Sequence, residues 1–255
     1  MTEILAVVNQ KGGVGKTTTC VNLASCLGKT DRNVLLLDID PQSNATKGSG
    51  INPQELNETI NDVLLNNLDI DDCIIDIKDY KYSLLPANPM LTQSEVELLA
   101  ADDKEFVLSN ILKQPSQKFD YVLIDCPPSL NILTVNALVA STSVLIPVQC
   151  EFYALQGLSE LNKTIEQIKK SANSSIEIKG ILRTMFDSRN NLADDVSRQL
   201  IKFFKDKVFK TIIPRNIRLA EAPSHGMPIL NYDSTSKGAF SYLSLAGEII
   251  KLENS

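Results

Sequence analysis

Short apolar runs alternate with stretches of helical periodicity along most of the chain. Continuous apolar runs of this length are typical of strands buried on both faces of a sheet, and they occur at 4–8, 34–37, 121–124, 144–148, 178–182 and 208–213. Apolar positions spaced three and four apart predict helices over 17–27, 92–100, 104–112, 131–139, 155–171, 193–204 and 238–252. Segment 53–79 is more acidic and less regular, and predicts a peripheral helix and a short strand.

This alternation predicts an α/β fold with a doubly wound, mostly parallel sheet, helices on both faces and right-handed crossovers. No internal repeat, low-complexity tract or Pro/Gly/Ser-rich linker interrupts the pattern. A chain of 255 residues is long enough for one large core. We therefore expect residues 1–255 to form a single domain.

Composition places the chain among ordinary globular proteins, with 43% hydrophobic and 22% charged residues. No apolar run approaches the ~18–20 residues of a membrane span, and the first three residues carry no basic n-region, so no signal peptide is expected. The 5 cysteines are odd in number and contain no Cys-x-x-Cys pair. Reduced thiols in a cytoplasmic protein are therefore expected, without a disulfide framework or a zinc site.

A glycine-rich segment joins the first apolar run to the first helical one. Residues 8–18 read Val-Asn-Gln-Lys-Gly-Gly-Val-Gly-Lys-Thr-Thr, the strand–loop–helix context of a phosphate-binding loop. Lys16 would reach the β- and γ-phosphates, and the Thr17 hydroxyl would ligate Mg²⁺. Backbone amides and the helix N-terminus would surround the phosphate oxygens, with Gly12, Gly13, Val14, Gly15 and Thr18 completing the loop. The alternative, a glycine-rich turn with solvated lysines, does not explain why strand, spacing and helix agree.

Two more apolar runs end in carboxylates. Asp38 and Asp40 follow 34–37, and Asp125 follows 121–124. Ligands of such sheets bind at the carboxyl ends of the strands, so these side chains are expected beside the loop. An aspartate in that place holds Mg²⁺ directly or through water. The structural alternative for each is a cap on the following helix.

The loop departs from the usual pattern, because Gln10 stands where that pattern has glycine and Lys11 follows it. The resulting Lys-Gly-Gly-Val-Gly-Lys-Thr sequence resembles the deviant P-loop of the ParA/MinD superfamily. The motifs at 38–42, 125–129, 214–216 and 221–226 resemble the successive motifs of ParA/Soj-type chromosome- and plasmid-partitioning ATPases. The resemblance covers nearly the whole chain.

The resemblance implies an ATP hydrolase that uses Mg²⁺, converts ATP and water to ADP and phosphate, and turns over slowly without a partner. It implies that Lys11 reaches the partner's nucleotide across an ATP-dependent homodimer, and that Asp40 orients the attacking water. Asp38 would support the metal shell. Adenine contacts would fall on Pro214 and Asn216, with Met185 nearby, although a turn proline and a helix-capping asparagine explain two of these equally well.

Charge is distributed unevenly. The net charge is −6, yet segment 163–218 carries 13 basic and 6 acidic side chains, a local excess that suits phosphate contacts. Within it, Arg189 and Arg218 resemble the family's non-specific DNA-binding arginines; surface ion pairs are the alternative. By resemblance the partners are double-stranded DNA and a ParB/Spo0J-type centromere-binding protein, in nucleoid-associated cytoplasm.

Rival functions make different demands on the sequence. A MinD-like membrane-positioning ATPase needs a basic amphipathic C-terminal helix, whereas residues 246–255 hold one lysine against two glutamates, so no membrane partner is expected. An iron-protein relative would need a defined cysteine pattern, and a kinase of this superfamily would need a tyrosine-rich tail. A nucleotide-gated scaffold that does not hydrolyse ATP is disfavoured because Lys16, Thr17, Asp40 and Asp125 are all present.

Overall fold

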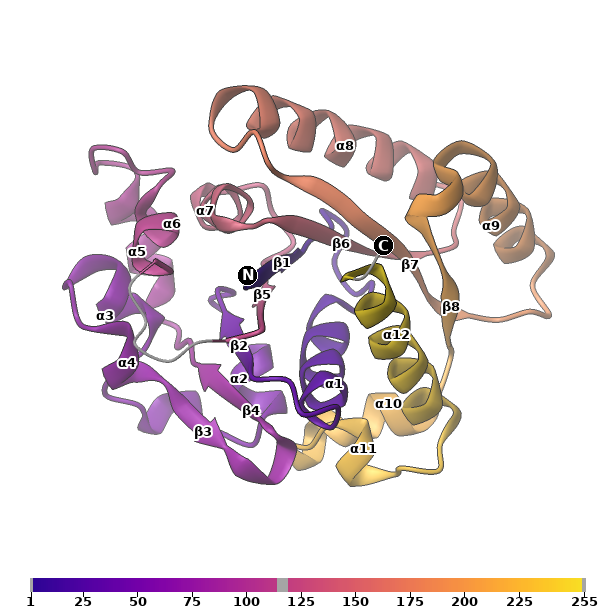
Figure 1. Cartoon of the computed structure of the whole chain (residues 1–255), viewed down its shortest axis with the longest axis horizontal. Helices are drawn as coiled ribbons and strands as arrows, with labels where there is room; N and C mark the ends of the chain where they lie inside the picture. Colours follow the sequence, from indigo (N-terminus) through magenta and orange to yellow (C-terminus); the bar gives the residue numbers. More distant parts are fainter. Residues whose placement is uncertain (1, 114–118, 254–255) are drawn as a thin grey trace.

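The computed structural model describes residues 2–113 and 119–253, and one twisted sheet runs through them (Figure 1). Its strand order is β3-β4-β2-β5-β1-β6-β7-β8. Every neighbouring pair is parallel except β3 with β4. The strands span Glu3–Val7 (β1), Val34–Asp38 (β2), Ile75–Ile77 (β3), Tyr82–Leu85 (β4), Tyr121–Asp125 (β5), Ser143–Gln149 (β6), Glu177–Phe186 (β7) and Val208–Pro214 (β8).

Helices cover both faces of this sheet (Figure 1). The longer ones are α1 (Lys16–Gly28), α5 (Leu91–Leu98), α7 (Ile132–Ala140), α8 (Ala154–Ser171), α9 (Asn191–Phe204) and α12 (Lys237–Glu253). Shorter ones are α2 (Asn44–Gly48), α3 (Ile60–Leu65), α4 (Ile70–Cys73), α6 (Val107–Ile111), α10 (Ile217–Glu221) and α11 (Ile229–Tyr232). The predicted α/β class with a doubly wound, mostly parallel sheet is confirmed.

Alternate residues of the central strands face two separate cores. Leu35 and Leu37 of β2 join the core beneath α3 to α9, whereas Leu36 joins the core beneath α1 and α12. Because both faces are covered, each strand reads as a continuous apolar run rather than as an alternating one. The six runs that predicted strands are strands for this reason.

The structure corrects the sequence prediction in its short elements. β4 was not predicted, although all four of its residues are buried beside β2. The strand predicted within 53–79 is the antiparallel edge strand β3, and two short helices, α3 and α4, stand where one was expected. Helix α6 occupies only 107–111 of the predicted 104–112, because residues 101–106 form turns and bends. Helices of about one turn carry too few apolar positions to show a period, so α2, α10 and α11 were missed.

The end of α1 packs tightly against the turn that precedes β4. A Cβ added to Gly28 would lie 1.8 Å from the carbonyl oxygen of Lys81. Gly28→Ala therefore forces backbone movement, and we expect it to lower the free energy of unfolding by about 1–3 kcal/mol, as overpacking does. Urea unfolding measures the change.

Gly157, inside α8, is the matched control, because nothing lies within 4 Å of a Cβ added there. Gly157→Ala should raise the free energy of unfolding by about 0.5–1 kcal/mol through helix propensity alone. Equal stability of the two variants would contradict the close approach at Gly28.

Candidate active site

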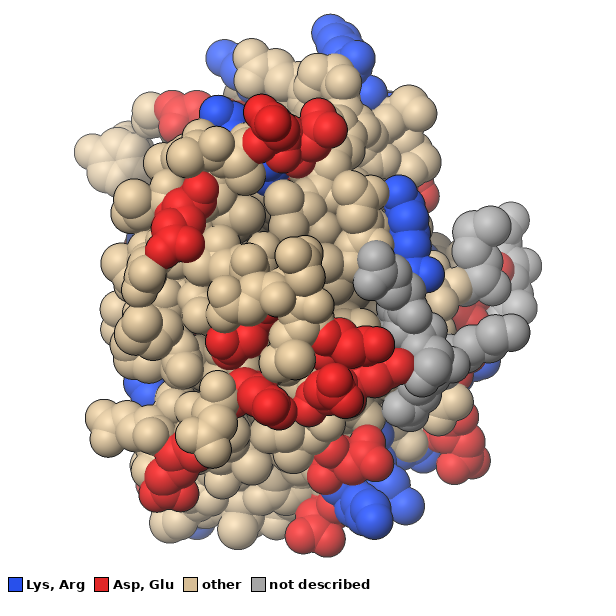
Figure 2. Space-filling view, turned by 90° about the vertical axis from the view of Figure 1, so that its left-hand side faces the viewer, with Lys and Arg blue, Asp and Glu red and all other residues tan. Residues whose placement is uncertain are grey.

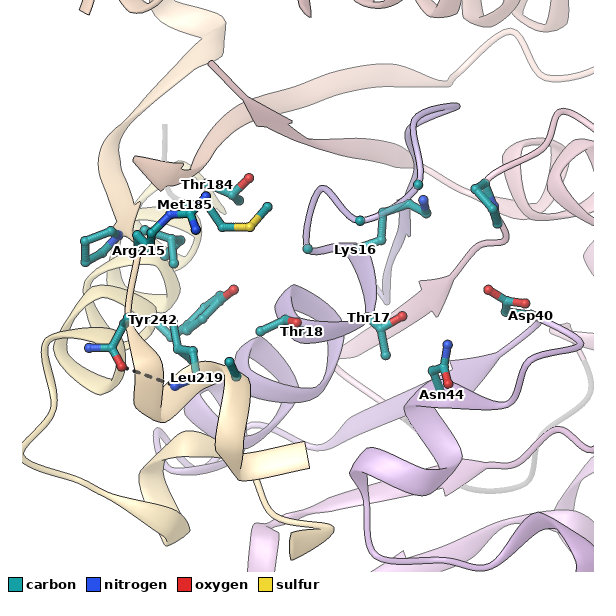
Figure 3. A pocket seen from close by; sticks show the side chains of 18 of the residues that line it. Lys16, Thr17, Thr18, Asp40, Asn44, Thr184, Met185, Arg215, Leu219 and Tyr242 are labelled. Carbon is teal, nitrogen blue, oxygen red and sulfur yellow. Dashed lines mark hydrogen bonds between the residues drawn. The ribbon is translucent and has the colours of Figure 1, made fainter. Parts of the chain in front are cut away.

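A cavity of about 470 Å³ opens at the carboxyl ends of the strands, between the glycine-rich loop and the last third of the chain. Figure 3 shows Lys16, Thr17 and Asp40 toward one end, and Met185, Arg215 and Tyr242 toward the other. The lining residues are Gly12, Gly13, Gly15, Lys16, Thr17, Thr18, Asp40, Gln42, Asn44, Pro128, Thr184, Met185, Ile213, Pro214, Arg215, Asn216, Leu219, Ala220 and Tyr242. Most of the residues predicted for nucleotide binding therefore meet in one cavity.

The loop wraps around an open concavity. Gly13 and Gly15 have φ angles of 71° and 90°, a region that glycine adopts without strain. Nothing lies within 4 Å of a Cβ added at Gly12 or Gly13. The Thr184 hydroxyl donates a 2.7 Å hydrogen bond to the Val14 carbonyl and ties the loop to β7. Since no side chain caps α1 at Gly15, its first amides are available to an anion.

Lys16 is only 7% exposed. Its Nζ donates a 3.3 Å hydrogen bond to the Lys11 carbonyl. Burial lowers the pKa of the ammonium, and the neighbouring Asp125 is the largest influence that opposes this shift. A largely buried cation in the lining of an open cavity is suited to a polyanionic ligand.

Asp125 is fully buried at the end of β5, beside Asp38 in the register with β2. Its Oδ1 accepts a hydrogen bond from the Cys20 thiol, with Sγ at 3.5 Å. Its Oδ2 is buried and has no hydrogen-bond partner among the described residues. Burial raises the pKa of this carboxyl, the charge of Asp38 raises it further, and the Thr17 hydroxyl lowers it.

An unpartnered, buried carboxylate oxygen beside a hydroxyl fits a hard divalent cation, which would take both as ligands. Within residues 2–113 and 119–253, no group of three or more His, Cys, Asp or Glu side chains could hold a metal ion alone. Mg²⁺ is usually held by one or two carboxylates together with substrate phosphates.

Asp38 is not among the residues that line the cavity, and both of its oxygens are engaged in hydrogen bonds. Oδ1 accepts from the Asp40 amide at 3.2 Å, and Oδ2 accepts from the Thr46 amide at 2.8 Å and hydroxyl at 2.7 Å. Burial raises the pKa of Asp38. Its role in the metal shell stays a prediction; the contacts observed fix the Asp40 segment and the start of α2.

Asp40 lines the cavity and is 7% exposed. Its Oδ1 accepts a 2.9 Å hydrogen bond from the Gln42 amide, which fixes the carboxylate just beyond the end of β2. In Figure 3 Asp40 and Asn44 lie on the same side of the cavity as Thr17. The carboxylate is thus placed beside the predicted phosphate and metal groups.

Lys11 lies outside the cavity lining, with half of its side chain exposed. Its ammonium forms an ion pair with Glu151, and its amide donates to Asn9 Oδ1 at 2.9 Å. Within one chain, therefore, the two lysines of the loop have different surroundings: Lys16 faces the cavity and Lys11 faces outward.

The predicted adenine contacts line the far end of the cavity. Met185 has a φ of 47° at the end of β7, and Pro214 ends β8. The Asn216 Oδ1 accepts the Leu219 amide at 3.1 Å, so this side chain also caps α10, as the structural alternative held. The sequence analysis did not predict Thr184, Arg215 or Tyr242 as part of the site. Of these, only Arg215 could have been found from the sequence, because it lies between the predicted residues Pro214 and Asn216.

The two predicted DNA-binding arginines lie outside the cavity and are paired. Arg189 donates to both oxygens of Asp187, at 2.9 and 2.7 Å, with 87% of its side chain exposed. Arg218 contacts Glu221 at 2.9 Å and Asp233 at 3.5 Å. The surface ion pairs weighed as the alternative are present. Such exposed pairs contribute little to stability because solvent screens them.

Comparison with known proteins places this site in a family. Residues 2–178 match the family model described as AAA domain. The chain is 49% identical to the sporulation initiation inhibitor protein Soj of Bacillus subtilis, covering 98% of each chain. It is also 49% identical to the chromosome partitioning protein ParA of Myxococcus xanthus, covering 98% of this chain and 88% of that one.

Solved structures agree with the predicted P-loop NTPase fold. Cobyrinic acid a,c-diamide synthase from Mycobacterium smegmatis, with bound ADP and magnesium, matches at a TM-score of 0.87 and 34% identity, covering 100% of this chain and 96% of that one. The septum site-determining protein MinD of Pyrococcus horikoshii, complexed with Mg-ADP, matches at 0.81 and 26%, covering 99% and 98%.

No helix in the described part of the chain is both long and apolar enough to cross a membrane. The fold, the P-loop and the near-complete coverage by close relatives agree with one another. The chain belongs to the ParA/Soj family of chromosome-partitioning ATPases.

Proposed function

We propose that the chain is a Mg²⁺-dependent partitioning ATPase that works in the nucleoid-associated cytoplasm. Its ATP-bound homodimer would bind double-stranded DNA without sequence preference and hydrolyse ATP when a ParB/Spo0J-type partner stimulates it, moving a chromosome or plasmid. One observation carries the proposal: Lys16, Thr17 and Asp40 line one cavity, and the Asp125 carboxyl group, whose Oδ2 has no hydrogen-bond partner among the described residues, interacts with the Thr17 hydroxyl. Solved relatives with ADP and magnesium support this choice of ligands.

The phosphate end of the cavity performs the chemistry. Lys16 and the amides of Gly13 to Thr18 hold the β- and γ-phosphates, since positioning and charge stabilisation supply most of the catalysis in phosphoryl transfer. Thr17 and Asp125 would hold Mg²⁺, which when bound neutralises charge on the β- and γ-oxygens. Asp40 orients the attacking water, and Asp38 positions Asp40 through the amide hydrogen bond at 3.2 Å.

Lys11 acts in the dimer. In the single chain its ammonium is paired with Glu151, with about half of each side chain exposed. An ion pair this exposed contributes about 0–1 kcal/mol and is readily exchanged for the phosphates of the partner's nucleotide. Lys11 then plays the part of an arginine finger supplied in trans, so hydrolysis needs the dimer.

The uneven distribution of acidic and basic side chains favours a DNA-binding surface on the side formed by α8, α9 and β8. Figure 2 shows acidic side chains gathered on the face that lies on the left of Figure 1, where α3 to α5 are, and Glu58, Asp62, Asp69 and Asp72 add to burial in raising the pKa of Cys73 there. Segment 163–218 carries 13 basic against 6 acidic side chains. Dimerisation would bring two copies of this segment to one DNA molecule and raise avidity, which makes DNA binding depend on ATP and on salt.

Co-sedimentation of the wild-type protein tests the proposal, with a slowly hydrolysed ATP analogue or ADP, against plasmid DNA and against anionic liposomes. We expect retention on DNA with the ATP analogue only, lost at higher salt. Retention on liposomes instead would move the protein to the MinD-like membrane-positioning branch. Retention on neither, despite nucleotide binding, would mean that the basic segment is a solvated surface.

Arg189→Ala combined with Arg218→Ala should abolish the retention on DNA and leave nucleotide binding and basal ATPase activity unchanged. The reason is that long cationic side chains contact the backbone phosphates of DNA whatever the base sequence. The same sedimentation assay measures the effect. Lys29→Ala with Arg32→Ala removes the same charge from the α1–β2 turn and should leave retention intact; a double arginine variant still retained on DNA contradicts the assignment.

A further inference from the structure

Cys20 lies beside the proposed metal site and has no role in the proposed mechanism. It belongs to α1, three residues after Thr17 and four after Lys16. Side chains at these spacings share one face of a helix. One face of α1 thus presents the phosphate-binding ammonium, the proposed metal-binding hydroxyl and a thiol toward the end of β5.

The Cys20 thiol gives the two carboxyl oxygens of Asp125 different surroundings. Oδ1 accepts the hydrogen bond from Cys20 Sγ at 3.5 Å, whereas Oδ2 has no partner among the described residues. A thiol is a weak donor, and its hydrogen bond holds the plane of the carboxyl group. Turning that plane would break the hydrogen bond, so the thiol opposes the turn.

Packing alone does not distinguish Cys20 from Cys26, which lies further along the same helix. Both are 0% exposed and both belong to the core beneath α1 and α12. Burial is the sole cause raising the pKa of Cys26, whereas Cys20 also interacts with Asp125. Cys26 therefore supplies a matched control for the loss of a buried thiol.

We propose that Cys20 is a positioning residue of the metal site: its thiol holds Oδ1 of Asp125, so that Oδ2 is presented to the cation. The proposal rests on the proposed function, because it assumes that Thr17 and Asp125 bind Mg²⁺. Residues that orient metal ligands cost about 10–100-fold in metal affinity when removed. A weak donor should lie at the low end of that range.

The test compares Cys20→Ala, Cys20→Ser and Cys26→Ala by titrating Mg²⁺ into protein with fluorescent ADP. We expect Cys20→Ala to raise the Mg²⁺ concentration for half-saturation about 10-fold, and Cys20→Ser, which keeps a donor, to restore it. Cys26→Ala should leave the half-saturation at the wild-type value, while its melting temperature falls as much as that of Cys20→Ala. ADP affinity in EDTA should be the same in all variants.

Equal half-saturation in Cys20→Ala and Cys26→Ala would overturn the proposal, as would a Cys20→Ser protein no better than Cys20→Ala. Should Cys20→Ala fail to fold, Cys20→Val fills the space without a donor, and its Mg²⁺ half-saturation decides in the same way. Wild-type ADP binding that does not depend on Mg²⁺ would overturn the metal site itself, which separates failure of the proposed function from failure of the role of Cys20.

Discussion

Lys16→Ala is expected to abolish nucleotide binding, with at least about a 100-fold loss of affinity, since charge-assisted contacts to phosphate are the strong ones. Lys16 is the buried cation of the loop, at 7% exposure, on the cavity floor. Fluorescent ATP and ADP binding measure the loss. Lys11→Ala is the matched control, because Lys11 lies outside the cavity; it should keep nucleotide binding by the single chain.

The same substitution has an opposite effect on the empty protein. Burial lowers the pKa of Lys16, which means that the folded state disfavours the charged ammonium at neutral pH. Removing the side chain removes this cost, so the nucleotide-free variant should be at least as stable to urea as the wild type. A Lys16→Ala protein that binds ATP normally, or that is unfolded, would contradict the assignment.

The residues that could be predicted from the sequence are those whose position follows from strand ends. Asp125 directly follows a buried run, and parallel strands end at one edge. The register then pairs Asp38 with Asp125 and Val7 with Asp125, so the loop after β1 lies next to Asp125, with Asp38 one strand further along the sheet. The spacing of glycine, lysine and threonine in the loop predicted the remaining residues at the phosphate-binding end of the cavity.

The far end of the cavity depends on long-range packing that no local pattern records. Tyr242 reaches the cavity from α12, where its hydroxyl lies 3.2 Å from that of Thr19, and Thr184 reaches it from β7. Helix periodicity places Tyr242 in a core and gives no indication of a ligand. The carboxylate of Asp38 is a similar case: only the structure assigns its oxygens to Thr46 and Asp40.

The role of the Asp38 contacts follows from what they restrain. Thr46 donates to Asp38 and accepts the Ala87 amide at 3.0 Å, which links α2 and the segment after β4 to the end of β2. Asp40 lies between these two anchored points. Its carboxylate is therefore fixed before nucleotide binds, and preorganised groups of this kind contribute most to charge stabilisation in the transition state.

Asp40→Ala should accordingly affect hydrolysis and spare binding. Asp40 contacts neither the loop amides nor Lys16 by a hydrogen bond within the described residues, so nucleotide affinity should change little. Hydrolysis should fall by at least about 100-fold, the loss expected when a group that orients the nucleophile is removed. The ATP-bound dimer, no longer able to turn over, should accumulate.

Light scattering of Asp40→Ala with ATP and with ADP measures this accumulation, and phosphate release measures the loss of turnover. A dimer with ATP and single chains with ADP are expected. Adding Lys11→Ala should return the ATP-bound protein to single chains, because the trans contact is then missing even though each loop still holds its nucleotide through Lys16. An Asp40→Ala protein that binds ATP yet stays monomeric would show that Asp40 acts in assembly and not in orienting water, and the dimer mechanism would then have to be abandoned.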